Sequence, residues 1–483
     1  MVTSPRRRRS SLVVVVLVAA ALAACSSSAP AAGPTTASGA STTTASAPTT
    51  TSPASPSTAA RDAFLAGYPL LVTERTIQTF AGLIGVNKLL RTAKLATDSS
   101  RFIVAPNHDT LYAIAVLDLR SGAQVLTVPQ IDRYYTVQFI DAWMDTVTNV
   151  GTRQTKGEAG SWIIVPPGYK EELPAGAKII HSPSNQLIML GRVRAVDGPD
   201  EAAAHAATDG MTLEPYGSTV AGEGPGIPVG PTPKIPRPPG TPQTTGENGL
   251  SYYDELGDAL AINPPPTARL KQVFARAAVV GIGAGKHPST DADPTMKAVL
   301  DHARTAGLAG LDAIGEAGGS DIDGWRVNVH LGDQAASLSL HAKAVVARNY
   351  WGPNVAAEST YPVAITASDG KPLTGDKRYV IHLPGNDLPP VKAFWSYTVY
   401  GPDSFFIKNP INRWSISGQT AGLQRGADGS IDIYLGATAP AGHEANWLPT
   451  PSSGPYKLVM RLYLPGPAIL DGTYHYPPVT VLP

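Results

Sequence analysis

The residues best suited to chemistry stand in the segment VAPNHDTLYAIAVLDL, which covers positions 104–119. Its polar part is Asn107-His108-Asp109-Thr110, and a long apolar run follows directly. An imidazole can act as a general base near neutral pH, and an ionised carboxylate can orient a ligand. One hypothesis is therefore that His108 and Asp109 are catalytic and that Asn107 contacts the ligand.

The same cluster also suits a turn at the entry to a strand. Asn, Asp and Thr side chains bond neighbouring backbone groups, and Pro106 restricts the chain just before them. This structural interpretation is favoured for Asn107, Asp109 and Thr110. It does not explain His108.

Arg153 is a further candidate for ligand binding. It follows a segment, residues 140–145, that contains two Asp and one Trp. A fixed guanidinium beside the end of a sheet could bind a carboxylate or a phosphate. It could also pair with Asp141 or Asp145 within the fold, and this structural pair is the favoured interpretation.

Two motifs near the C-terminus place amides beside Trp residues. A Trp face offers a stacking surface, and amides beside it can hydrogen-bond a sugar. The competing and favoured interpretation is a buried Trp next to an Asn that satisfies loop backbone. The candidate ligand-binding residues are Asn412, Arg413 and Trp414 in the first motif and Asn446 and Trp447 in the second.

Short motifs of several enzyme classes are missing from the sequence. The segment GIGAGKH at 281–287 lacks the Gly and the Ser or Thr that a Walker loop requires. The S-x-x-K match at 368–371 contains a Gly and precedes a Pro, which preclude the helix of that motif. The ten His residues are scattered singly, so no metal site is expected, and the sequence identifies no cofactor.

The rest of the chain must form the framework that positions these residues. Apolar residues recur at helical spacing after Arg61, which predicts one or two opening helices. Short strands in close succession then favour an antiparallel sandwich. The predicted strands are 111–118, 123–128, 134–140, 161–165, 186–196, 362–366, 378–382, 393–400, 422–424, 431–435 and 457–464, with a hairpin turn at 428–429. The predicted helices are 252–262, 267–280, 294–314 and 333–348.

The N-terminal segment is typical of a bacterial lipoprotein. Four Arg residues precede an apolar run at 12–22, which is shorter than the roughly 20 residues that span a bilayer. The run ends in Leu-Ala-Ala-Cys, and Cys25, the expected lipidation site, is the only Cys of the chain. Residues 26–60 contain only Ser, Thr, Ala, Pro and Gly, a composition that predicts a disordered tether. We therefore expect a lipid-anchored protein on the extracytoplasmic face of a bacterial membrane. The formal net charge is zero, so nucleic acid is not an expected partner.

Several long motifs resemble a known pair of domains. The segments VAPNHDTLYAIAVLDL, VPQIDRYYTVQFIDAW and NVGTRQTKG resemble the domain of unknown function numbered twelve-fifty-four. The segments PPVKAFWSYTVYG, IKNPINRW, GLQRGADGSIDIYLG, NWLPTP and MRLYLPGPAILDGTYHYPPV resemble its usual C-terminal companion, numbered twelve-fourteen. The resemblance implies an immunoglobulin-like N-terminal sandwich, a helical insertion and a jelly-roll-like C-terminal domain. It implies no activity. A Pro-rich arm in the middle, the tether and the anchor are departures from the pair.

The expected fold is multi-domain α+β and mainly β. The expected division is a signal peptide at 1–24, the lipidated Cys and tether at 25–60, an N-terminal sandwich at 61–197, a Pro- and Gly-rich arm at 198–250, a helical region at 251–360 and a C-terminal domain at 361–483. The leading functional hypothesis is binding of a small molecule or cell-envelope glycan between the two β domains. One alternative is a hydrolase or lyase with Asn107, His108, Asp109 and Arg153 in its site. Another is a structural subunit of the cell envelope, for which an oligomer of identical chains stays open.

Overall fold

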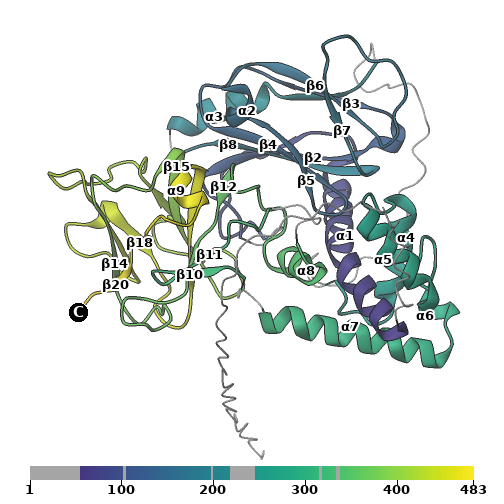
Figure 1. Cartoon of the computed structure of the whole chain (residues 1–483). Coiled ribbons are helices and arrows are strands. Elements are labelled where there is room, and N and C mark those ends of the chain that lie inside the picture. The colour runs from purple at the N-terminus through teal and green to yellow at the C-terminus, as the bar shows by residue number, and fades with distance from the viewer. Residues whose placement is uncertain (1–54, 102–104, 197–198, 218–244, 315–317, 333–337) are drawn as a thin grey trace, which may run out of the picture. The chain divides into compact units, whose positions relative to one another are not determined.

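The computed structural model describes residues 55–101, 105–196, 199–217, 245–314, 318–332 and 338–483 (Figure 1). The predicted signal peptide, Cys25 and the tether up to residue 54 lie outside the described residues, as does the Pro-rich centre of the predicted arm. Two β sandwiches and a helical middle region make up the described chain. The predicted α+β architecture is therefore confirmed.

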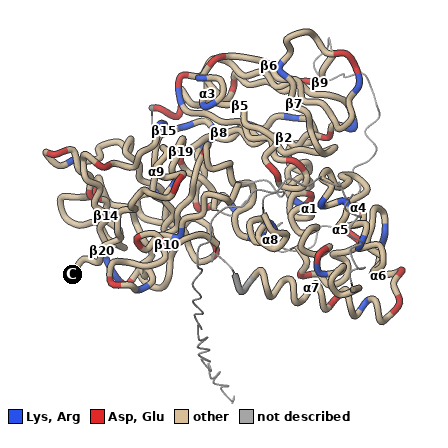
Figure 2. The backbone as a smooth tube through the Cα atoms, in the orientation of Figure 1, with Lys and Arg blue, Asp and Glu red and all other residues tan. Residues whose placement is uncertain are grey.

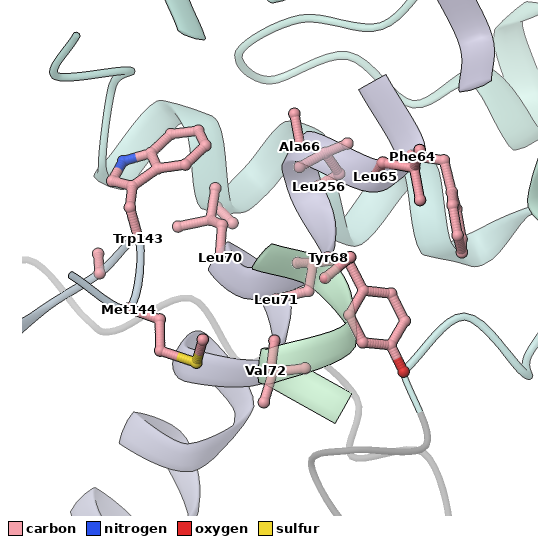
Figure 3. Packing of buried hydrophobic residues seen from close by; sticks show 14 of the residues in the cluster. Phe64, Leu65, Ala66, Tyr68, Leu70, Leu71, Val72, Trp143, Met144 and Leu256 are labelled. Carbon is pink, nitrogen blue, oxygen red and sulfur yellow. The ribbon is translucent and has the colours of Figure 1, made fainter. Parts of the chain in front are cut away.

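A single helix, α1 (Pro56–Ile84), opens the folded region. It begins where the Ser55 hydroxyl accepts a hydrogen bond from the Thr58 amide at 3.2 Å, with a proline in the first turn, which is the usual N-terminal chemistry of a helix. The tether prediction therefore ended too late, since residues 56–60 are helical. Trp143 and Met144 pack beside Leu70 and Val72 of α1 (Figure 3).

The N-terminal sandwich consists of a five-stranded and a four-stranded sheet. The first has the order β1 (Leu90–Arg91), β2 (Thr110–Asp118), β8 (Gln186–Arg194), β4 (Tyr135–Asp141) and β5 (Thr146–Gly151). The second has the order β7 (Lys178–His181), β6 (Gly160–Val165), β3 (Gln124–Val128) and β9 (Thr212–Pro215). A short helix, α2 (Thr152–Thr155), follows β5, and α3 (Pro199–Asp209) precedes β9. Both α3 and β9 fall in the predicted arm, which was wrong there because β9 pairs with β3.

The strands β2 and β8 present different side chains to the two faces of their sheet. Alternate residues of a strand point to opposite faces. Leu111, Ala113 and Leu117 enter the core of the sandwich, whereas Ile114 and Val116 join the core that α1 covers. The strands are antiparallel, and their register pairs Ile114 with Leu190 and Tyr112 with Arg192. On the face of the β2–β8 pair that is turned toward α1, the side chains therefore change from the apolar pair Ile114–Leu190 to the polar pair Tyr112–Arg192.

The helical region packs around α1 (Figure 1). It comprises α4 (Ser251–Ile262), α5 (Ala268–Ala277), the 3-10 turn η3 (Ala278–Val280), α6 (Pro288–Asp291), α7 (Pro294–Ile314) and α8 (Leu340–Asn349). The helix predicted at 333–348 begins later, because the Ser339 hydroxyl caps α8 by accepting from the Ala342 amide. The first part of that prediction, residues 333–337, lies outside the described residues.

The C-terminal domain is a second pair of sheets packed face to face. One contains β10 (Ser320–Ile322), β11 (Trp325–Val327), β13 (Val363–Ala364), β19 (Lys457–Pro465), β15 (Val391–Tyr400) and β16 (Ser415–Ser417), and β12 (Ser359–Thr360) pairs with β19. The other contains β18 (Trp447–Pro449), β17 (Ile431–Gly436), β14 (Tyr379–Leu383) and β20 (Val479–Val481). The turn η4 (Glu444–Asn446) precedes β18, and α9 (Pro467–Leu470) follows β19.

Two details of the C-terminal domain differ from the sequence prediction. The strands β10 and β11 come from the region predicted to be helical, because they extend the sheet of β13 and β19. Residues 422–424 are not a strand. A turn is present at 428–429, with Gly429 at a φ of 82°, a conformation that favours glycine, but the predicted hairpin is wrong because β17 pairs with β14 and β18.

Acidic and basic residues are scattered over many elements of the described chain (Figure 2). No helix of the described part is long and apolar enough to cross a membrane.

Candidate functional site

The Asn107–Thr110 cluster forms a turn, and it also joins the two β domains. The Asn107 side-chain oxygen accepts from the Asp109 amide at 2.8 Å. Its side-chain nitrogen donates to the Thr110 hydroxyl at 3.1 Å and to the Tyr463 hydroxyl of β19 at 2.8 Å. The turn chemistry is therefore present, and one of its groups holds the C-terminal sheet.

Asp109 is buried between strands of the C-terminal domain. Its carboxylate accepts from the Ser396 hydroxyl of β15 and, at 2.7 Å, from the Ser415 hydroxyl of β16. The side chain is 2% exposed, so both hydrogen bonds are shielded from water. Asp109 thus fixes the N-terminal turn to two C-terminal strands.

His108 is held by the backbone and by aromatic rings. Its Nδ1 lies 2.6 Å from the Ala96 carbonyl, and a carbonyl can only accept, so this nitrogen carries a proton. The ring meets Trp414 edge to face, with centroids 5.1 Å apart. Trp414 donates its indole N–H to the Ile407 carbonyl at 3.1 Å. These contacts account for the burial of a His that turn chemistry did not explain.

A polar pocket of about 200 Å³ lies beside this turn. Four residues singled out from the sequence meet there, although they stand some 300 positions apart: His108, Asp109, Asn412 and Arg413. The Arg413 guanidinium donates to the Trp447 carbonyl at 2.8 Å and to the carbonyls of Glu444 and Ala445. We name this space the polar pocket.

A larger cavity of about 490 Å³ lies on the other side of the turn. We name it the central cavity. Its lining comes from α1, β1, β2 and β8 on one side and from β13, β15 and β19 on the other, with the chain after α8 between them. One part is apolar and is lined by Phe80, Leu83, Ile84, Leu90, Ile114 and Leu190. The other part is polar and is lined by Asn107, Tyr112, Arg192, Tyr361, Arg461 and Tyr463.

Arg192 is the least satisfied group of the central cavity. The residue is 8% exposed, and its guanidinium makes one hydrogen bond, from Nη1 to the Gln138 side-chain oxygen at 2.9 Å. A guanidinium has five N–H donors. The other four have no acceptor within the described residues. Burial lowers the pKa of Arg192, but neighbouring tyrosines, Tyr361 first, raise it above its ordinary value, so the group stays charged.

Arg461 is buried among neutral oxygens. It donates to the Thr398 hydroxyl at 3.0 Å, to the Ala105 carbonyl at 3.1 Å and to the Tyr400 hydroxyl. Burial lowers the pKa of Arg461, but Tyr400 and the other neighbours outweigh it and keep that pKa above its ordinary value. Arg461 therefore brings a fixed positive charge to the cavity and holds the chain just before the turn.

The central cavity has a positive lining. Lys94, Arg192, Lys457 and Arg461 line it, and no Asp or Glu does so among the described residues. The carboxylate of Asp109 is engaged with two hydroxyls behind the turn. The cavity thus holds positive charge without an acid of its own.

Arg153 takes the structural role that its sequence context favoured, with a different partner. It donates from Nε to Glu358 at 2.8 Å, and Glu358 also accepts from the Tyr134 hydroxyl at 3.0 Å. Asp145 pairs instead with Lys343 at 2.6 Å. The expected pairing with Asp141 or Asp145 is wrong, because Arg153 pairs with the fully buried Glu358. Arg153 lines neither the central cavity nor the polar pocket.

The Asn446 and Trp447 side chains satisfy loop backbone. Asn446 accepts from the Gln424 amide at 2.7 Å and donates to the Gln424 and Asp432 carbonyls at 2.9 Å. Trp447 is 6% exposed and donates its indole N–H to the Gly436 carbonyl at 2.8 Å. Neither offers an open face for a sugar.

The sequence interpretation overlooked Arg192 and Arg461. Both stand in strands that it predicted, at positions where apolar and charged residues share one face. Along β19, Lys457, Val459 and Arg461 alternate with the core residues Leu458 and Met460. An Arg at an inward position of a buried strand is the signal that could have found them. In the described part of the chain, no three His, Cys, Asp or Glu side chains are grouped to hold a metal ion.

Comparisons with known proteins identify the two domains. A family described as "Protein of unknown function (DUF1254)" matches residues 86–215, and one described as "Protein of unknown function (DUF1214)" matches residues 358–467. The resemblance stated from the sequence motifs is therefore confirmed. A search of curated proteins gave no match.

Two solved structures are similar to this chain. The VPA0106 protein from Vibrio parahaemolyticus is 21% identical with a TM-score of 0.66, over 89% of this chain and 100% of that chain, and therefore shares the fold. An uncharacterized protein from Burkholderia cenocepacia is 13% identical with a TM-score of 0.44, over 86% of this chain and 87% of that chain.

Proposed function

We propose that this protein, in which a DUF1254 domain precedes a DUF1214 domain, binds a small molecule in the central cavity. The observation that carries the proposal is the cavity itself, whose lining comes from both domains. Its volume of about 490 Å³ lies within the roughly 300–1,000 Å³ that is usual for small-molecule sites. Mostly apolar walls with a few convergent polar groups are the usual composition of such sites.

The way in which the two domains are joined supports this proposal. Asn107 and Asp109 of the N-terminal turn hydrogen-bond Tyr463, Ser396 and Ser415 of the C-terminal sheet. These contacts are buried, so the cavity walls are held in place before a ligand arrives. Preorganised walls favour binding because less conformational entropy is lost.

The neutral fluorescent probe N-phenyl-1-naphthylamine tests this proposal. The mature protein should bind it at one saturable site. Ile84 lines the central cavity at the end of α1, and Ile84→Trp should weaken binding because the larger ring fills the cavity. Ile179→Trp is the matched control, since Ile179 is 37% exposed on β7 and does not line the cavity. A wild type without a saturable site, or an Ile84→Trp variant with unchanged affinity, would contradict the proposal.

We also propose that the folded part is tethered to the extracytoplasmic face of a bacterial membrane through lipid on Cys25. The basic segment, the apolar run at 12–22 and the Leu-Ala-Ala-Cys ending support it. One acyl chain binds a membrane reversibly, and stable anchoring takes a second. Metabolic labelling with a palmitate analogue should mark the wild type, and Cys25→Ser should remove both the label and the membrane fraction. A labelled Cys25→Ser protein would refute the anchor.

The arrangement of the site does not favour the hydrolase or lyase alternative. Asn107 lines the central cavity, His108 and Asp109 line the polar pocket, and Arg153 lines neither. The Asp109 carboxylate is occupied by two serine hydroxyls, and His108 Nδ1 by a backbone carbonyl.

The envelope-subunit alternative also lacks a specific supporting observation. Large exposed apolar residues in the described chain stand singly on separate elements, which is ordinary for a folded protein. They are Leu83, Ile179, Val279, Ile411 and Leu470.

A further inference from the structure

We infer that the ligand of the central cavity is an amphiphile with one carboxylate head group, whose carboxylate binds Arg192 and whose apolar chain runs toward the end of α1. This inference rests on the proposed function and names its ligand class. It follows from the charge of one part of the cavity, the composition of the other part, and the strand register that joins them.

Arg192 carries a buried positive charge that has no anionic partner within the described residues. A buried cation normally has a carboxylate partner, because removing an unpaired charge from water costs several kcal/mol. Arg75 is buried and pairs with Glu255 at 2.6 Å, whereas the buried Arg461 has no carboxylate partner and instead donates to three neutral oxygens. Arg192 is similarly buried but has only a neutral amide oxygen as acceptor within the described chain. It also lines a cavity, so its missing acceptor can be supplied by a ligand.

The guanidinium of Arg192 and the groups around it suit a carboxylate. A guanidinium and a carboxylate can form two parallel hydrogen bonds, and this geometry favours a carboxylate over a single-atom acceptor. Tyr112 stands directly opposite Arg192 in the β2–β8 register and lines the same cavity. Its hydroxyl can donate to a carboxylate oxygen. Arg461 and Lys457 add positive charge from the opposite wall. A cationic ligand would meet four basic side chains and no acid in this lining.

The cavity wall next to Arg192 is apolar and suits a hydrocarbon chain. The next inward pair along β2 and β8 is Ile114 and Leu190, about 7 Å from the Tyr112–Arg192 pair at two residues along a strand. Leu90 stands opposite Ile114 in the β1–β2 register, the chain just after α1 bonds β2 at Val116, and Phe80, Leu83 and Ile84 near the end of α1 also line the cavity. A ligand that reaches from Arg192 along this wall must therefore be polar at one end only. An uncharged glycan would leave Arg192 without its anion and place hydroxyls against apolar side chains.

Leu83 gives the apolar end of the cavity a connection to the surface. It lines the cavity, and 57% of the residue is exposed. Arg192, at the other end, is 8% exposed. The ligand therefore lies with its head group inside and its chain toward the exposed end.

Competition with bound N-phenyl-1-naphthylamine tests the inference. The competitors are dodecanoate, 1-dodecanol and dodecyltrimethylammonium, which share a twelve-carbon chain and differ in head group. The two ionic competitors are used below their micelle concentrations and 1-dodecanol below its solubility limit. Wild-type protein should prefer dodecanoate over dodecanol by at least about 30-fold, because removing one partner of a buried charge pair costs roughly 2–5 kcal/mol. Dodecyltrimethylammonium should compete least. This comparison uses the wild type alone, so it tests the head-group preference even if a variant fails to fold.

Two variants then locate the head group. Arg192→Met should abolish the preference for dodecanoate over dodecanol. Arg425→Met should keep it, since Arg425 is exposed and lies outside the cavity lining.

The outcomes separate this inference from the proposed function. Equal competition by dodecanoate and dodecanol, competition by none of the three, or a preference that survives Arg192→Met would overturn the inference, while saturable probe binding would still support a small-molecule site. Failure of the probe itself to bind would overturn the proposed function.

Discussion

Replacing Arg192 by Met is predicted to stabilise the ligand-free protein while removing its selectivity for a carboxylate. An effective penalty of several kcal/mol accompanies burial of an unpaired ion, and water in the central cavity offsets part of it. The substitution also removes the hydrogen bond to Gln138, and bonds to charged groups contribute about 1.5–3 kcal/mol. The net change in the free energy of unfolding should then be a gain on the order of 1–2 kcal/mol.

The assay is denaturant and thermal unfolding of protein that was unfolded and refolded on a column to remove bound amphiphile. Arg75→Met is the matched comparison, because the same side chain is buried to a similar degree but pairs with Glu255. Breaking a buried pair leaves the acid alone and costs about 3–5 kcal/mol. The two identical substitutions should therefore change stability in opposite directions.

An Arg192→Met variant that destabilises the ligand-free protein as much as Arg75→Met does would refute this prediction. That result would mean that the fold itself satisfies the Arg192 guanidinium, and the cavity would then hold no charge that calls for an anion. We predict that Arg192→Met gains stability and loses the preference for dodecanoate. This combination is typical of a residue that serves binding and destabilises the fold.

Two further predictions concern buried acids. Burial raises the pKa of Glu74 from 4.5 to about 7, so folding favours its protonated form. The protonated Glu74 therefore contributes fully to stability below pH 4.5. This contribution is lost as the pH rises through about 7, and the free energy of unfolding falls by about 3 kcal/mol in all. Glu74→Gln should remove this decline in unfolding measurements from pH 4.5 to 8, whereas exposed Glu158→Gln should not; a decline that persists in Glu74→Gln would assign it to another group. Arg153→Met should destabilise the protein by about 1 kcal/mol, because it leaves the buried Glu358 without a cation but Arg153 itself is 36% exposed and screened by water. Adding Glu358→Gln should recover part of that loss in the same measurement, and no recovery would contradict the pairing.

The sequence predicted the elements well where local pattern decides the structure. The helix at 294–314 and the strands around β2, β8, β15 and β19 follow from apolar periodicity. The opening helix was placed too late because residues 56–60 resemble the tether in composition, while Ser55 and Pro56 carry the capping signal. The strands β10 and β11 were missed because each has three residues, and pairing with distant chain stabilises them.

The site was harder to predict because its groups meet only through tertiary structure. Turn chemistry at Asn107 and Asp109 could be read from the sequence, but their partners Tyr463, Ser396 and Ser415 lie about 290–360 positions away. The local sequence marks Arg192 only by its position in a buried strand, and this does not show that the side chain faces a cavity. What distinguishes it is the register that places it beside Tyr112, facing a second domain, and this depends on the packing of both sheets.

The most direct test of the central claim is a crystal structure of the protein with 12-bromododecanoate, in which anomalous scattering locates the bromine. The carboxylate should lie within hydrogen-bond distance of the Arg192 guanidinium, and the bromine should lie near Phe80 and Leu83. A bromine beside Arg192, or a ligand outside the central cavity, would contradict the account.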